Sequence, residues 1–180
     1  EQTASVIAAL DQAALDTAFM QVKQCIDRGG IIYTCGNGGS GATASHFAGD
    51  IMKGLSYGKQ KRCKAICLND NITALMAISN DASYAEIFVE PLKNMLTPND
   101  VLVALTGSGN SENIIQALRY AKEVGASSVL LCGFDGGAAK PLADCVVHVP
   151  VDQMEVAETA HMAVCHALKM GVAQTELKRS

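Results

Sequence analysis

The amino-acid sequence predicts a single doubly wound α/β domain, in which about five parallel strands are covered by helices on both faces. Short, continuous apolar runs recur along the chain, and each is followed by a stretch whose apolar residues have helical spacing. Strands buried on both faces have such continuous apolar runs, and their alternation with helices is typical of parallel sheets. The length of 180 residues fits one domain, 1–180, with no linker or internal repeat.

The N-terminal region precedes the strands and has the pattern of a helix. Apolar residues between positions 4 and 27 recur at helical spacing, and Gly29 and Gly30 end the run. We therefore expect one long helix within residues 1–28. Its apolar stripe is broad, so we expect this helix to pack onto a partner subunit, while residues 29–180 form the α/β core.

Strands and helices alternate in the core. The strands are expected at residues 31–35, 65–68, 101–105, 129–132 and 146–149. The helices are expected at residues 40–54, 74–79, 84–96, 111–124 and 155–177. Ligands of such sheets bind beyond the carboxyl ends of the strands, where the chain turns into a helix, so functional residues are expected in these turns.

Composition and charge argue against several function classes. The formal net charge is -4 and no basic run occurs, so a nucleic-acid partner is not expected. The apolar stretches are too short to span a bilayer, and the N-terminus lacks the pattern of a secretory signal. The seven cysteines are odd in number and form no C-x-x-C pair, which is typical of reduced thiols. We therefore expect a cytoplasmic protein.

Two loops rich in glycine and hydroxyl groups follow predicted strands and lead into helices. The first covers residues 35–41 (CGNGGSG) and the second covers residues 106–111 (TGSGNS). Glycine lets the backbone approach an anion closely, and a helix N-terminus presents unpaired N–H groups. Two such loops in one small domain predict a site for a phosphate monoester. The candidate binding residues are Asn37, Gly38, Gly39, Ser40, Thr106, Gly107, Ser108 and Ser111.

The first loop also matches the dinucleotide-binding pattern G-x-G-x-x-G, through Gly36, Gly38 and Gly41. That pattern requires an acidic residue about twenty positions further on, at the end of the second strand. Asp70 is late for this role, and the second loop has no part in such a site. A nicotinamide-dependent enzyme is therefore the weaker alternative.

Carboxylates and imidazoles that suit a metal lie on two predicted helices. His46 and Asp50 are four residues apart, so they project from one helix face. In the last helix, Glu158 can share a face with His161 or with His166, but not with both. Two carboxylates and two imidazoles are a ligand set for tetrahedral zinc. The alternative is that these groups pair on a helix surface or lie in the core, and periodicity alone leaves both open.

Several motifs, taken in order, resemble the SIS-domain phosphoheptose isomerases, and the match runs over nearly the whole chain. They are residues 35–40 (CGNGGS), 46–48 (HFA), 77–81 (AISND), 108–111 (SGNS), 133–137 (GFDGG) and 158–166 (ETAHMAVCH). The resemblance implies a flavodoxin-like SIS domain that forms a homotetramer with zinc-dependent sites at subunit interfaces. It also implies the isomerisation of sedoheptulose 7-phosphate to D-glycero-D-manno-heptose 7-phosphate.

The resemblance further implies roles for individual residues. The sugar phosphate is held by Ser40 and the loop 108–111, with Asn37 and Asp81 near the sugar chain and Asp152 in contact with substrate. The metal positions correspond to His46, Asp50, Glu158 and His166. Of these, Asp50 and His166 are expected to transfer protons.

Several residues depart from the family pattern and leave the substrate open. The family usually has Glu at Asp50, Gln at Glu158 and Arg at Gly54, and Ser-Thr in place of Thr106-Gly107. One alternative is therefore an isomerase of another sugar phosphate. A second is a non-catalytic SIS protein that senses a sugar phosphate or serves as a protein-binding scaffold. Such relatives can lose the metal residues, so the carboxylates and His166 favour an enzyme.

Overall fold

The computed structural model describes residues 1–177 and confirms the doubly wound α/β architecture. Five parallel strands lie in the order β2-β1-β3-β4-β5. The strands are β1 Ile31–Gly36, β2 Lys64–Cys67, β3 Val101–Thr106, β4 Ser127–Cys132 and β5 Cys145–His148. The strand order reverses between β1 and β3, so the loops that leave these two neighbouring strands diverge there and leave room for a ligand.

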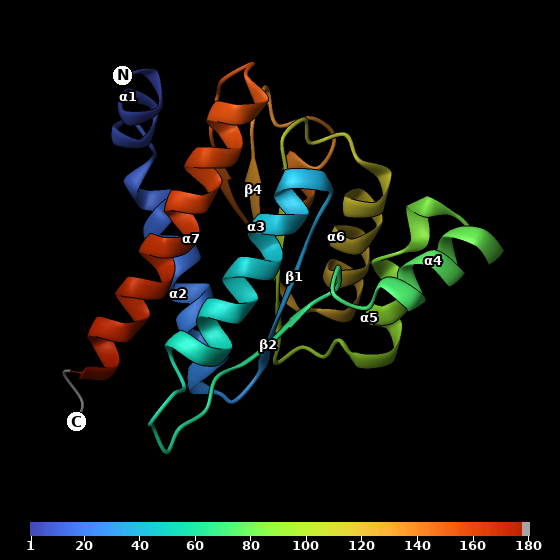
Figure 1. The fold of residues 1–180 in the computed structure, drawn as a ribbon, viewed down its shortest axis with the longest axis horizontal. Helices are drawn as coiled ribbons and strands as arrows, with labels where there is room; N and C mark the ends of the chain where they lie inside the picture. Colours follow the sequence, from blue (N-terminus) through green and yellow to red (C-terminus); the bar gives the residue numbers. More distant parts are fainter. Residues whose placement is uncertain (178–180) are drawn as a thin grey trace.

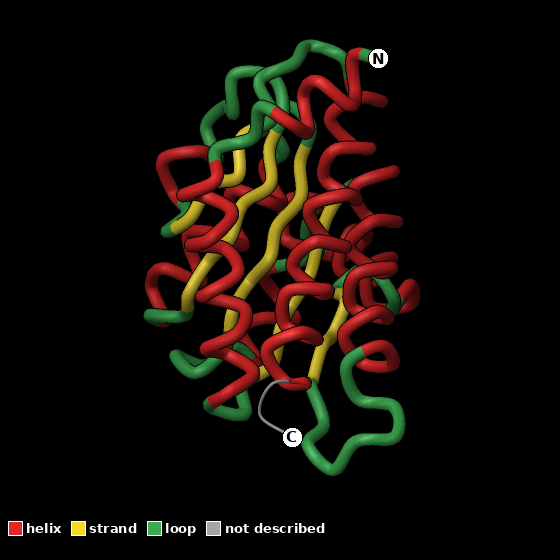
Figure 2. The backbone as a smooth tube through the Cα atoms, turned by 90° about the vertical axis from the view of Figure 1, so that its left-hand side faces the viewer, coloured by secondary structure: helices red, strands yellow, loops and turns green. Residues whose placement is uncertain are grey.

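Helices cover both faces of the sheet (Figures 1 and 2). One face packs against α2 (Gln12–Asp27), α3 (Gly38–Gly49) and α7 (Met154–Leu177), and the other against α5 (Val89–Met95) and α6 (Glu112–Val124). Successive strand residues enter opposite cores: Val103 packs with the first set of helices and Ala104 with the second. Burial on both faces is why these strands have continuous apolar runs.

The N-terminal segment is two helices rather than the single long helix expected from its spacing. Helix α1 spans Gln2–Ala8, and α2 begins only at Gln12. The break lies at Asp11, whose carboxylate accepts a hydrogen bond from the backbone N–H of Ala13 at 2.9 Å. A side chain that caps a new helix start takes the place of the continued helical hydrogen bonds. That residues 1–28 pack onto a partner subunit stays a prediction.

Two expected helices are also subdivided. Helix α3 continues into a π-helical turn, η1 (Asp50–Gly54), and the predicted helix over residues 84–96 is a 3-10 turn, η2 (Tyr84–Glu86), followed by α5. Helix α4 (Ile72–Asp81) lies at the outer edge of the molecule and buries none of its residues (Figure 1). A second 3-10 turn, η3 (Lys140–Leu142), precedes β5. The π-helical turn matters for function because Asp50 is its first residue.

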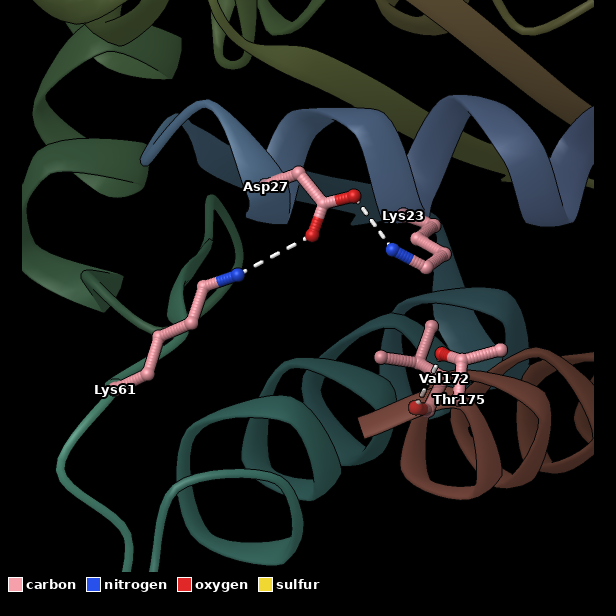
Figure 3. A network of polar contacts seen from close by, with 5 residues as sticks. All are labelled: Lys23, Asp27, Lys61, Val172 and Thr175. Atoms are coloured by element: carbon pink, nitrogen blue, oxygen red, sulfur yellow. Dashed lines mark hydrogen bonds and ion pairs between the residues drawn. The ribbon is translucent and has the colours of Figure 1, made fainter. Parts of the chain in front are cut away.

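The segment between η1 and β2 is attached to the end of α2 by charged side chains. The Asp27 carboxylate contacts the Lys23 ammonium at 2.5 Å and the Lys61 ammonium at 3.2 Å (Figure 3). The hydrogen bond from Lys23 is the main reason why the pKa of Asp27 lies below its ordinary value. These two ion pairs lie at the C-terminal end of α2, which is the end away from the carboxyl edge of the sheet. Among residues 1–177, no helix combines the length and apolar character needed to cross a bilayer.

Candidate functional site

The first glycine loop is wound tightly between β1 and α3. A Cβ on Gly36 would lie 2.5 Å from the carbonyl carbon of Ser40, so only glycine fits there. The Asn69 amide binds both backbone groups of Gly36: its oxygen accepts from the N–H at 3.2 Å, and its nitrogen donates to the carbonyl at 2.7 Å. These contacts hold the N-terminus of α3, with its unpaired N–H groups, at the edge of the sheet.

Asn37 is oriented by two neighbours. Its side-chain oxygen accepts hydrogen bonds from the Tyr84 hydroxyl and from the Asn113 amide, both at 2.9 Å. Its side-chain nitrogen donates to Asn113 at 3.0 Å. Asn113 is itself buried, so Asn37 is held by the α6 core rather than by solvent.

The second loop follows β3, the neighbour of β1, and stabilises its own turn with hydroxyl groups. The Thr106 hydroxyl accepts from the backbone N–H of Gly109 at 3.1 Å, and the Ser108 hydroxyl accepts from that of Asn110 at 3.2 Å. Both loops therefore present hydroxyls and amides from adjacent strands. That the two loops bind one small anion stays a prediction.

A third segment, residues 133–139, packs directly beneath the second loop. The Ala139 N–H donates to the Gly109 carbonyl at 2.8 Å, and the Gly133 N–H donates to the Gly107 carbonyl at 2.9 Å. Gly109 has φ of +71°, and a Cβ there would lie 1.9 Å from the Gly136 carbonyl oxygen. This close backbone contact fixes the position of the second loop.

The two loops enclose a cavity of about 230 Å³. All eight loop residues predicted from the sequence line it, together with Glu158 and Met154 from the start of α7. No lysine or arginine is among these described lining residues. Met154 was not predicted, because a methionine at a helix start has no sequence signal for a binding site.

The two predicted aspartates do not line this cavity. Asp81 ends α4 and accepts a hydrogen bond from the Asn80 side chain at 2.7 Å, while Asp152 lies exposed in the segment before α7. A second cavity, of about 500 Å³, shares Asn37 and Gly38 with the first and extends towards α4. Asn80, not Asp81, lines it. Their contact with substrate stays a prediction.

Three of the four predicted metal ligands come together where α3 and η1 meet α7. The Nε2 atoms of His46 on α3 and His166 on α7 lie 3.0 Å apart. Asp50 Oδ2 lies 3.7 Å from His46 Nε2 and 3.9 Å from His166 Nε2. The side chains are 49%, 27% and 48% exposed for His46, Asp50 and His166, so the cluster faces outward.

The donor set of this cluster fits a zinc ion. Two imidazole nitrogens and a carboxylate oxygen are ordinary zinc ligands, and the ligand atoms of a tetrahedral site lie roughly 3.3 Å from one another. The three ligand atoms here lie 3.0, 3.7 and 3.9 Å from one another, close to that spacing. The exposed side leaves further coordination positions open to substrate or water.

Glu158 lies between the cluster and the cavity. Its carboxylate lies against Gly39, where a Cβ would be 2.3 Å from Oε2. Glu158 lines the cavity between the two loops and also the hollow that contains His166 and Thr43. It does not join the three-residue cluster, so a role as fourth metal ligand stays a prediction.

The remaining histidine of α7 belongs to the core, which was the alternative left open by periodicity. His161 is fully buried, and neither ring nitrogen has a hydrogen-bond partner. Burial lowers its pKa to about 4, with a smaller opposing effect of the Cys132 backbone. His161 is therefore neutral and takes no part in the cluster.

Two further observations bear on the sequence predictions. The Asp70 carboxylate accepts a hydrogen bond from the Ser45 hydroxyl at 2.7 Å and does not line the cavity, which weakens the dinucleotide interpretation. The space over Gly54 contains the Lys169 side chain from α7, with Cε 2.9 Å and Nζ 3.4 Å from the position of a Cβ. A cation from α7 therefore lies over Gly54.

Comparison with known proteins shows the family of this chain. The sequence profile of the SIS domain matches residues 1–133. A phosphoheptose isomerase of Helicobacter pylori (strain ATCC 700392 / 26695) is 37% identical over 157 residues, which cover 87% of this chain and 81% of the relative. The chain belongs to the phosphoheptose isomerases.

Two further proteins are similar to this chain. The structure of a phosphoheptose isomerase from Neisseria gonorrhoeae superposes with a TM-score of 0.88 at 29% identity, over 96% of this chain and 92% of that one. The lincomycin biosynthesis protein LmbN of Streptomyces lincolnensis is 41% identical over 150 residues, covering 78% of this chain and 54% of LmbN. The chain is therefore similar both to phosphoheptose isomerases and to a protein of lincomycin biosynthesis.

Proposed function

We propose that this phosphoheptose isomerase converts sedoheptulose 7-phosphate to D-glycero-D-manno-heptose 7-phosphate by metal-assisted proton transfer. The observation that supports this most is the position of Glu158, which lines both the phosphate cavity and the hollow with His166. A substrate whose phosphate lies between the two loops can therefore extend past Glu158 to the His46–Asp50–His166 cluster.

The phosphate end is bound by neutral groups. The hydroxyls of Ser40, Ser108 and Ser111 and the N–H groups at the start of α3 donate hydrogen bonds to its oxygens. Asn37, held by Asn113 and Tyr84, is placed to bind a sugar hydroxyl. The Glu158 carboxylate accepts hydrogen bonds from sugar hydroxyls that are further from the phosphate.

Isomerisation requires removal of a proton from the carbon next to the carbonyl and its return to the neighbouring carbon, through an enediol. Asp50 and His166 are the proton carriers: the carboxylate takes the carbon-bound proton, and the imidazole moves the hydroxyl proton. A zinc ion held by His46, Asp50 and His166, with Glu158 as the predicted fourth ligand, would supply positive charge to the substrate oxygen. We further propose that the protein acts in the cytoplasm as a homotetramer.

The test is to incubate zinc-supplemented protein with sedoheptulose 7-phosphate in D2O and to follow C1 and C2 by NMR. We expect the aldose to appear with deuterium at C2. Asp50→Asn should abolish turnover with the fold intact, whereas Glu123→Gln, an exposed carboxylate on α6, serves as the matched control. His166→Ala should lose both activity and bound zinc.

The outcomes separate the alternatives. An active Asp50→Asn enzyme would exclude Asp50 as the base. Deuterium exchange without net product would keep the mechanism and change the substrate. Neither exchange nor zinc binding would favour a non-catalytic sugar-phosphate sensor or scaffold.

A second candidate is an isomerase of another ketose phosphate. It is favoured by the 41% identity to LmbN, a protein of lincomycin biosynthesis. Turnover of a longer ketose phosphate in the same assay, at a higher kcat/KM than that of the heptose phosphate, would establish it.

A further inference from the structure

The thioether of Met154 fills the space where a side chain at position 107 would lie. A Cβ on Gly107 would be 2.1 Å from Met154 Sδ and 2.7 Å from Met154 Cε. Gly107 is not among the glycines with positive φ, so its backbone conformation does not require glycine. The end of the Met154 side chain therefore occupies the space that a side chain at position 107 would need.

Met154 also forms part of the cavity wall on the side of α7. It lies four residues before Glu158, so both side chains project from one face of the helix, and both line the cavity. Met154 is 39% exposed, which places it at the mouth rather than in the core. The other lining residues are the polar or glycine residues of the two loops, apart from Glu158.

The physical properties of methionine give this wall two functions. An unbranched side chain with three rotatable bonds can adapt its shape to a bound ligand while it still fills part of the cavity. Its thioether and methyl groups favour contact with carbon atoms rather than with hydroxyls or phosphate oxygens. An apolar group beside the two loops can contact the carbon atom that carries the phosphate ester.

We propose that Met154 is a specificity-determining residue: it contacts the carbon skeleton next to the phosphate and limits the size of the phosphorylated sugar that the cavity admits. This rests on the proposed function only in taking a sugar phosphate as the ligand. The phosphate itself is bound by the loops, and Met154 selects among the molecules attached to it.

The test compares binding of two probes by calorimetry, inorganic phosphate and sedoheptulose 7-phosphate. Met154→Ala removes the carbon contact, so the Kd for the heptose phosphate should rise about tenfold more than the Kd for inorganic phosphate. Met154→Leu, which restores apolar volume, should recover most of the loss. Met170→Ala, an exposed methionine on the same helix, is the matched control.

Size selection is tested with an eight-carbon ketose phosphate. Met154→Ala should shift the ratio of affinities towards this longer ligand. A loss that is equal for inorganic phosphate and the heptose phosphate, or no difference from Met170→Ala, would overturn the proposal.

A double-mutant cycle tests the contact with Gly107. Gly107→Ser forces Met154 out of its position, so it should weaken heptose phosphate binding strongly in the wild type and much less in Met154→Ala. Effects that simply multiply would show that the two residues act independently and would contradict the proposal.

Binding and turnover are measured separately, so the two proposals fail separately. Heptose phosphate binding without isomerisation would overturn the proposed function and leave the role of Met154 supported or refuted by the Kd values. A wild-type protein that binds neither inorganic phosphate nor the heptose phosphate would overturn the assignment of Met154.

Discussion

Substitution of Gly109 by alanine tests whether the second loop depends on its close contact with residues 133–139. Gly109 has φ of +71°, and a Cβ there would lie 1.9 Å from the Gly136 carbonyl oxygen. The left-handed conformation alone costs an L-residue roughly 1–2 kcal/mol. The overlap adds about 1–3 kcal/mol, because both partners are backbone and a shift of one loop breaks its hydrogen bonds with the other. The expected loss in free energy of unfolding is therefore about 2–5 kcal/mol.

Gly125 provides the matched control for backbone conformation. Its φ is +79°, and no atom lies within 4 Å of the position of its Cβ. Gly125→Ala should therefore cost only the conformational part, roughly 1–2 kcal/mol. Urea unfolding followed by circular dichroism measures both losses, and the difference between them isolates the contact between the loops.

The same variants should differ in ligand binding. Gly109→Ala displaces the Ser108 region and should weaken inorganic phosphate binding, whereas Gly125 lies at the far end of α6 and should leave it unchanged. Equal losses of stability in the two variants, with phosphate binding intact in Gly109→Ala, would refute the view that residues 133–139 position the phosphate loop.

Three other predictions follow from buried or displaced groups. Burial lowers the pKa of His161 to about 4, so the unfolded chain binds more protons than the native protein between pH 6.5 and 4. The free energy of unfolding should therefore fall by roughly 3 kcal/mol as the pH is lowered from 6.5 to 4. His161→Leu should remove this part of the pH dependence in urea unfolding, and an unchanged slope would contradict it. Lys169→Met removes the cation over Gly54 and should lower kcat about tenfold, whereas Lys53→Met should leave kcat unchanged. Equal effects of the two substitutions on kcat would count against a role for Lys169. Burial raises the pKa of Cys25 and Cys132 to about 11. Native protein at pH 8 should therefore react quickly with a thiol reagent only at Cys63, which is partly exposed, and fast reaction of several thiols would show that the core opens.

The sequence predicted the sheet because burial on both faces leaves a continuous apolar run that is hard to mistake. Val101, Leu102 and Val103 are all fully buried, although successive residues face different helices. The break between α1 and α2 was missed, because the apolar spacing continues through Leu10. The signal that could have found it is Asp11, a favoured helix N-cap.

The candidate site was predicted in part, because some of its residues are related by local spacing in the sequence. His46 and Asp50 share a helix face through local spacing, and the resemblance to a family brought in His166, which meets them in the structure. The contacts of Met154 with Gly107 and of Lys169 with Gly54 join residues far apart in the chain. Neither periodicity nor a motif encodes such contacts, since they depend on where α7 packs across the two loops.

The absence of lysine and arginine among the described residues that line the cavity between the two loops has a consequence for the rate and salt dependence of the proposed phosphate binding. An anion is attracted over a distance of ångströms by charged side chains, but hydroxyls and backbone N–H groups act only at contact. If the proposal is correct, no cationic side chain among the described lining residues guides the phosphate ester to the cavity, and the Glu158 carboxylate and the net charge of -4 oppose its approach slightly. Added salt screens that repulsion and leaves the hydrogen bonds intact, so affinity should hold or rise slightly with ionic strength, the opposite of a site built on basic residues.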